Sequence, residues 1–221
     1  MFTTFYHGSI RKLVVAFGSL FNNVYIVRSD SENNEQKRIK VPLSYGPKEK
    51  FYRKIRELDE AASRNAVENI LPRMSFEITS MIYDTTRKLN SLNKVYSQRN
   101  EEDATFSYAY SEVPYNIEFT LNIMNRSIDD GYQILEQVLP YFTPDFTISM
   151  NFTELDKKID VPIVLNSVSS NEDYEGDLAD QRRTITHSLT FLAKSYIFGP
   201  IRTSGLIREV NLTFQELTDD V

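Results

Sequence analysis

The sequence predicts an α+β protein, a single domain in which a mixed or antiparallel β-sheet is flanked by about three α-helices. Two observations predict this class. Segments with alternating apolar and polar residues outnumber those with helical spacing, and several of them follow one another directly along the chain. The 221 residues include no Cys, and 41% are hydrophobic against 25% charged. This is the composition of a globular protein that folds without disulfides, and we expect residues 1–221 to form one domain.

Three segments have the apolar spacing of amphipathic helices, namely 10–21, 47–58 and 127–139. The second opens with a proline, which suits a first helical turn. The third opens with Ser127 as a cap, followed by two aspartates that the helix dipole favours. Gly131 in this third helix has no side chain, so we expect the helix to pack closely on the sheet.

Strands are expected where apolar and polar residues alternate. These segments are 24–28, 38–45, 74–83, 115–124, 146–152, 159–165, 184–196 and 210–214. We expect the first two to form a hairpin. We also expect Met74, Phe76, Ile78 and Ile82 to share one face of the third strand. The polar stretch 87–103 and the acidic stretch 167–180 are expected to be connections.

No motif for catalysis or for a cofactor is found, and we expect no catalytic, cofactor-binding or metal site. There are two histidines, and His187 shares the apolar register of a strand, where a hydrogen-bonded structural histidine is the commoner case. Seven glycines leave little room for a phosphate-binding loop. The acidic stretch 171–180 places Gly176 as an EF-hand requires, but Arg182 stands where the loop needs glutamate.

The same inventory argues against a membrane or nucleic-acid partner. Arg11 and Lys12 follow the first aromatic residues, the wrong order for a signal peptide, and no stretch approaches about 18 uninterrupted apolar residues. The net charge is −6, whereas a dedicated nucleic-acid binder carries a basic patch. The aromatic residues mostly occupy core registers, so we expect no direct sequence-specific binding of nucleic acid.

Charge is segregated along the chain, and this suggests candidate interfaces. The predicted second helix is basic, with Lys48, Lys50, Arg53 and Lys54, while the acidic stretch carries Glu172, Asp173, Glu175 and Asp177 and is followed by Arg182 and Arg183. The two surfaces are complementary for a head-to-tail contact between copies. The last segment, with Val210, Leu212 and Phe214, is a candidate edge strand within an arm at 205–221. A solvated helix face and an ordinary terminal strand are the alternative interpretations.

Five blocks of sequence resemble a known family. They are MFTTFYHGSIRKLVVAFGSLFNNVYIVR, IKVPLSYGPKEKFYRKI, ILPRMSFEI, IDDGYQILEQVLPYFTPDFTISM and EGDLADQRRTITHSLTFLAKSYIFGPI. The most specific parts are QILEQVLPYF followed by P-x-F, and RR-x-I-x-x-SLTF. In their order and spacing the blocks resemble the tail terminator, or tail sheath stabiliser, of contractile-tailed bacteriophages, over nearly the whole chain to about residue 208.

The resemblance implies a structural virion protein that acts without a cofactor at the junction of tail and neck and is assembled in the host cytoplasm. It implies a homo-hexameric ring that caps the head-proximal end of the tail, stops growth of tube and sheath, and presents the docking surface for the head. The implied partners are the tail sheath protein, the tail tube protein or tube terminator, and the neck or head-completion proteins. Two alternatives stay open: another neck or tube-completion ring protein, and a metal-dependent enzyme using His187 with the acidic stretch.

Overall fold

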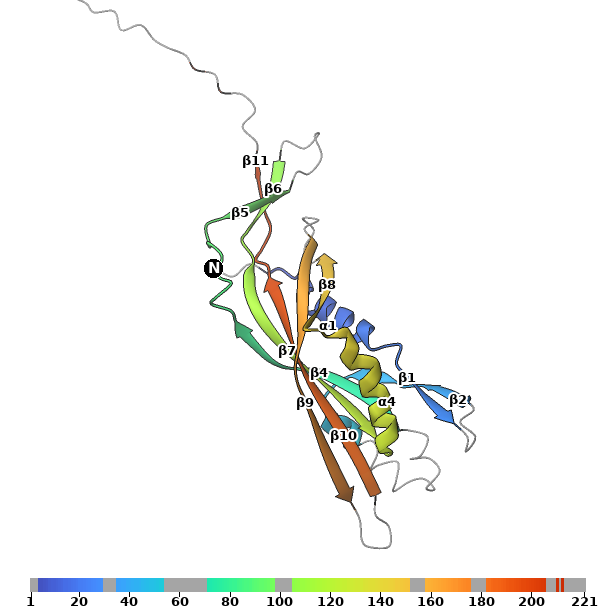
Figure 1. Ribbon diagram of the computed structural model, residues 1–221. Helices are drawn as coiled ribbons and strands as arrows, with labels where there is room; N and C mark the ends of the chain where they lie inside the picture. The colour runs from blue at the N-terminus through green and yellow to red at the C-terminus, as the bar shows by residue number, and fades with distance from the viewer. Residues whose placement is uncertain are drawn as a thin grey trace, which may run out of the picture.

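A six-stranded sheet, with strand order β3-β4-β7-β10-β9-β8, forms the body of the protein (Figure 1). The computed structural model describes residues 4–29, 35–53, 71–97, 105–151, 158–175 and 182–205, together with Val210 and Leu212. The strands of this sheet are β3 (Leu43–Tyr45), β4 (Arg73–Tyr83), β7 (Val113–Asn125), β8 (Asp145–Asn151), β9 (Lys158–Glu175) and β10 (Arg182–Ile197). The β3–β4 pair is parallel and the other pairs are antiparallel, so the predicted mixed sheet of an α+β protein is confirmed.

Two smaller sheets lie beside the body. The hairpin of β1 (Tyr25–Ser29) and β2 (Glu35–Lys40) is the one predicted from sequence, whereas β5 (Lys94–Ser97), β6 (Thr105–Tyr110) and β11 (Arg202–Gly205) form a three-stranded sheet that we call the distal sheet. The helical segments within the described ranges are α1 (Ser9–Leu20), residues 48–53, α4 (Ile128–Val138) and the 3-10 turn η1 (Leu139–Tyr141). Over those same ranges, no helix is long and apolar enough to cross a membrane.

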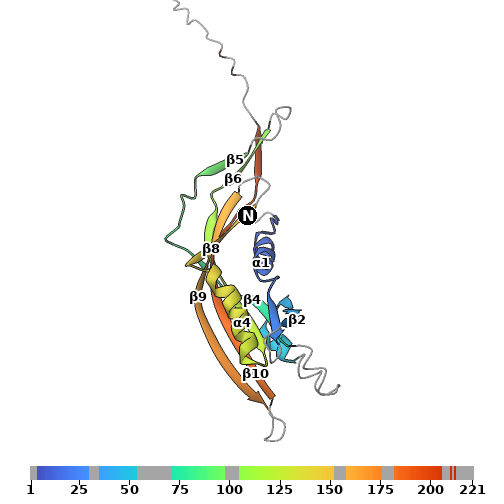
Figure 2. The ribbon, with the colours of Figure 1, turned by 45° about the vertical axis from the view of Figure 1, so that its right-hand side comes forward.

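One face of the large sheet is apolar and carries α1 and α4, which Figure 2 shows on the concave side of the curved strands. The register of the strands brings their predicted apolar residues together on this face, with Phe191 of β10 opposite Phe119 of β7. Phe17 of α1 is fully buried against them, with its ring centre 4.3 Å from that of Phe119 and 5.4 Å from that of Phe191. The same ring is 5.4 Å from Phe76 of β4, so one side chain joins α1 to three strands.

Helix α4 lies close to the sheet because Gly131 has no side chain. A Cβ atom at this position would be 2.4 Å from Nε2 of His187 and 2.8 Å from Nδ2 of Asn125, both shorter than any normal contact. The close packing predicted for Gly131 is therefore confirmed. The same helix holds β1: the amide of Gln133 accepts from the backbone N–H of Val27 (2.9 Å) and that of Gln137 donates to the carbonyl of Tyr25 (2.6 Å).

Several boundaries differ from the sequence prediction for physical reasons. The predicted strand 38–45 is divided at Val41 and Pro42 into β2 and β3, which pair with different strands. The expected connection 87–103 contains β5, and the expected acidic loop is strand β9 as far as Glu175. A bulge between Ile78 and Ser80 shifts the alternation of β4, so Ile82 faces solvent instead of the core face.

Replacing Phe17 by Ala should lower the free energy of unfolding by about 3–5 kcal/mol, because the change leaves a cavity among four elements. Val15→Ala in the same helix is the matched control, since Val15 is 65% exposed and should change stability by less than about 0.5 kcal/mol. Urea denaturation followed by circular dichroism measures both values. Equal effects of the two variants would show that Phe17 does not hold α1 on the sheet.

Candidate assembly interface

Strands β9 and β10 form an arm that carries the predicted acidic residues. In Figure 1 the two strands extend past the lower end of α4, and their register places Glu172 opposite Ile185 and Asp173 opposite Thr184. Both carboxylate residues are exposed. Glu175 pairs with Arg182 at the end of the described arm, where Arg183 also lies in β10; Asp177 falls outside the described residues. We call residues 171–175 and 182–186 the acidic arm.

The helical segment 48–53, which we call the basic helix, lies on the face of the sheet opposite α1 and α4. Its buried residue, Phe51, has the guanidinium carbon of Arg73 5.4 Å from its ring centre, and the hydroxyl of Tyr52 is hydrogen-bonded to that of Thr186. Lys48, Lys50 and Arg53 are exposed, as the sequence predicted, and Lys54 lies outside the described residues. The basic charges therefore stand on an anchored helix.

The structure brings the basic helix and the acidic arm to the same end of the molecule. Thr186, which contacts Tyr52, pairs in register with Asn171 at the base of the arm. Asn171 in turn donates a hydrogen bond of 3.1 Å to Asp173. The sequence separates the two surfaces by more than a hundred residues, so only the fold reveals that they are neighbours.

Most of the predicted terminal strand lies outside the described residues, as do Phe214 and most of the expected arm 205–221. The two apolar residues of the segment that are described, Val210 and Leu212, are exposed and lie in no strand. A short strand that was not predicted precedes them, since Arg202–Gly205 forms β11 and pairs antiparallel with β6.

The distal sheet is a surface that the sequence prediction missed. Its central strand β6 places Phe106, Tyr108 and Tyr110 on one face, and two cations flank these rings. Nζ of Lys94 is 4.7 Å from the ring centre of Tyr108, and the guanidinium carbon of Arg202 is 5.7 Å from that of Tyr110. The alternation in TFSYAY at 105–110 was the available signal, but the run lies directly after a polar stretch that indicates a loop.

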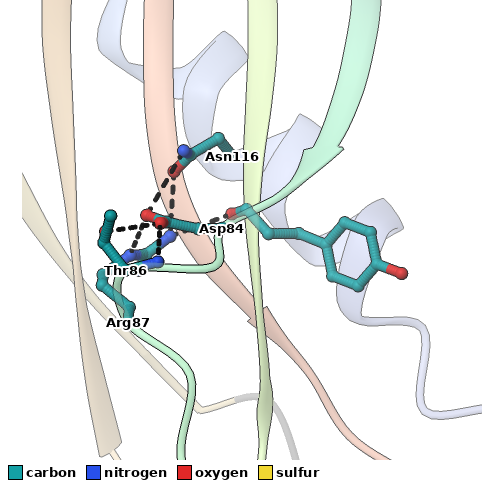
Figure 3. A network of polar contacts seen from close by, with 5 residues as sticks. Asp84, Thr86, Arg87 and Asn116 are labelled. Atoms are coloured by element: carbon teal, nitrogen blue, oxygen red, sulfur yellow. Dashed lines mark hydrogen bonds and ion pairs between the residues drawn. The ribbon is translucent and has the colours of Figure 1, made fainter.

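A polar network fixes the bend where β4 leaves the body toward the distal sheet (Figure 3). Nε of Arg87 donates to Oδ2 of Asp84 at 2.7 Å, and Nη2 of Arg87 donates to Oδ1 of Asn116 at 2.9 Å. The hydrogen bond from Arg87, with a second from Thr86, holds the pKa of Asp84 well below its usual range. The guanidinium carbon also lies 5.0 Å from the ring centre of Tyr196, so the bend is attached to β10 as well.

His187 is a buried structural side chain in the interface between α4 and the sheet. Its Nδ1 is 2.6 Å from Oγ of Ser170, and its Nε2, which has no partner within the described residues, faces Gly131. Burial lowers its pKa, and the nearby charge of Glu172 only partly offsets this. Within the described ranges, no group of three or more His, Asp or Glu residues is placed to hold a metal ion.

The described surface has an acidic arm beside a basic helix at one end and an aromatic sheet at the other, which are features typical of a protein that assembles with other proteins. Comparison with known proteins agrees with this class. The chain belongs to the family described as T4-like virus Myoviridae tail sheath stabiliser, which it matches over residues 4–221. It is similar to the tail completion protein gp15 of Enterobacteria phage T4, with 34% identity over 228 residues, covering all of this chain and 82% of that protein. The family gives the chain a structural role as a component of the virion tail.

Acidification should destabilise the fold through His187. Because burial lowers the pKa of the folded histidine, the unfolded chain binds its proton more readily, and the free energy of unfolding falls as the pH drops below about 6.5. The loss is at most about 1.4 kcal/mol per pH unit for one group. Urea denaturation at pH 7.5 and 5.5 should show a larger loss for the wild type than for His187→Gln.

Wild type and variant have the same carboxyl groups, so the contribution of these groups to the pH dependence cancels when the two proteins are compared. His7→Gln is the control for removing a histidine elsewhere, since His7 lies just before α1, where its Nε2 is 2.9 Å from the carbonyl oxygen of Gly199. A pH dependence equal in wild type and His187→Gln would exclude His187 as its source.

Proposed function

We propose that the chain forms a homo-hexameric ring on the head-proximal end of the contractile tail, where it terminates tube and sheath and stabilises the sheath. The ring then presents the docking surface for the head and neck. The observation that carries this proposal is the match to the sheath stabiliser family over residues 4–221, nearly the whole chain. The name of the T4 relative, a tail completion protein, supports a position at the end of the tail.

The proposed partners are further copies of the chain, the tail sheath protein, the tail tube protein or tube terminator, and the neck or head-completion proteins. We further propose that residues 1–221 act as a single tail-terminator domain, assembled in the host cytoplasm and placed at the junction of tail and neck. The shape of the molecule supports contacts with different partner proteins at its two ends. The distal sheet and the acidic arm lie at opposite ends of the body in Figure 1, and they carry different chemistry.

A neck or tube-completion ring of the same virion is the second candidate, and position separates the two. Electron microscopy of head-less tails with labelled protein should show the label at the head-proximal end of the sheath. Tails made without the protein should be overlong or ragged, or should lose their sheath. Normal tail length and an intact sheath in its absence would contradict the proposed function.

Charge reversal on the basic helix should impair ring formation or sheath attachment. The variant Lys48→Glu, Lys50→Glu, Arg53→Glu changes three exposed positions, so the fold should be kept while the surface becomes acidic beside the acidic arm. Purified protein tests the ring by light scattering, and complementation of tails that lack the protein tests sheath retention. Lys54, the fourth basic residue predicted for this surface, can be reversed in addition to extend the change.

The matched control is Arg11→Glu, Lys37→Glu, Lys40→Glu, at three exposed positions on α1 and β2. Each reversal adds −2, so both triple variants move the net charge from −6 to −12. The control should assemble like the wild type. If both variants lose assembly equally, net charge and not the basic helix is responsible.

A further inference from the structure

The large sheet ends on both sides in a strand edge that no described strand covers. On one side, β3 pairs only with Met74–Phe76 of β4, which leaves the last seven residues of that strand, 77–83, beyond it. On the other side, β8 is the last strand and is seven residues long. The two open edges therefore have equal length and face opposite directions, with β7, β10 and β9 between them (Figure 1).

The open part of β4 has the character of a surface that is covered in the working assembly. Met81, Ile82 and Tyr83 are consecutive and 43%, 62% and 38% exposed, so apolar side chains project from both faces of an edge strand. Soluble proteins blunt such edges with charges, proline or a covering element, because an open apolar edge recruits other strands. The run 79–83 contains neither a charge nor a proline.

The contrast with β1 strengthens this argument. There, the backbone groups of Tyr25 and Val27 are occupied by the amide side chains of Gln133 and Gln137. No described side chain does the same for 77–83 of β4. On β8, Nζ of Lys12 donates to the carbonyl of the last residue, Asn151, at 3.3 Å.

Strand β8 is suited to receive another strand without being an aggregation site itself. Phe146, Ile148 and Met150 pack toward the core, while the alternate positions Asp145, Thr147, Ser149 and Asn151 are polar and exposed. Its polar face therefore keeps it soluble, and its backbone edge stays available for a ladder of hydrogen bonds.

We propose that 77–83 of β4 pairs with β8 of a neighbouring copy, which joins the large sheets of adjacent subunits edge to edge. The occupant is a second copy because one contact then covers both edges, whereas a peptide from another protein would leave one of them open. Two different patches on the same chain make a heterologous contact, which closes into a ring when the rotation allows. This inference rests on the ring in the proposed function and names the residues that close it.

Engineered disulfides test the pairing directly, because the chain has no cysteine. Pairs are formed by Ser80→Cys or Ile82→Cys with Thr147→Cys or Ser149→Cys, four combinations that sample the register. Within one copy the two strands are four spacings apart, roughly 19 Å, too far for a disulfide. Any bond formed between β4 and β8 cysteines therefore joins two copies.

After mild oxidation of the assembled protein, at least one pair should give a ladder of covalent oligomers on a non-reducing gel. Single-cysteine variants should stop at dimers or stay monomeric. The matched control, Ile82→Cys with Lys37→Cys, uses an exposed position on β2, which among the described strands pairs only with β1, and should give no ladder. Circular dichroism before oxidation verifies that each variant is folded.

A second pair of variants tests the edge without cysteine. Ile82→Lys places a charge on the open edge and should convert the ring to monomers, whereas Leu92→Lys, at a loop position 78% exposed, should keep the ring. If light scattering finds no ring for the wild type, the proposed function and the edge pairing both fail. If the wild type forms a ring but no pair gives a ladder and Ile82→Lys still assembles, the edge pairing alone is overturned.

Discussion

The contact of Phe17 with the large sheet is the constraint on which the rest of the structure depends. The ring of this residue packs on Phe119 and Phe191 and also contacts Phe21 and Phe76. Phe21 and Phe191 in turn contact Phe142, just after η1. One aromatic cluster thus fixes α1, the end of α4 and the central strands together. Because this cluster and its aliphatic neighbours form the main apolar core, one face of the sheet is covered by α1 and α4.

The other face and the strand edges consequently lie outside this core. The polar face carries Asn122, Thr120 and Glu118 along β7, and it is covered near Thr186 by the basic helix. Burial, together with the charge of Glu49, raises the pKa of Glu77 on the same face. Among the described strands, β3 and β8 are the edges of this sheet, so further strands could be added only in its plane.

The parts of the fold that depend on local periodicity could be predicted from the sequence. The alternation of Ile117, Phe119, Leu121 and Ile123 predicted β7, and the spacing in 127–139 together with Ser127 predicted α4. The predictions that were wrong concern features that depend on contacts between residues distant in the sequence. Pro42 changes the partner of a strand, a bulge at 78–80 turns Ile82 outward, and the acidic stretch becomes strand because it is paired with β10. The predicted interface residues could be named from charge alone, but their proximity could not, since it arises from the contact of Tyr52 with Thr186.

The connections between the distal sheet and the body are short, and this has a mechanical consequence. Residues 111–112 join β6 to β7 and residues 198–201 join β10 to β11, so a pull on the distal sheet is transmitted into the body along these strands. Strands β7 and β10 are joined by thirteen residue pairs, from Ile185 with Asn125 to Ile197 with Val113. Because ladder hydrogen bonds lie perpendicular to the strands, a force along the strand axis that acts on one of the two loads the whole ladder in shear instead of opening it one pair at a time. The pairing of β7 with β10 therefore resists a force that is applied along either strand alone.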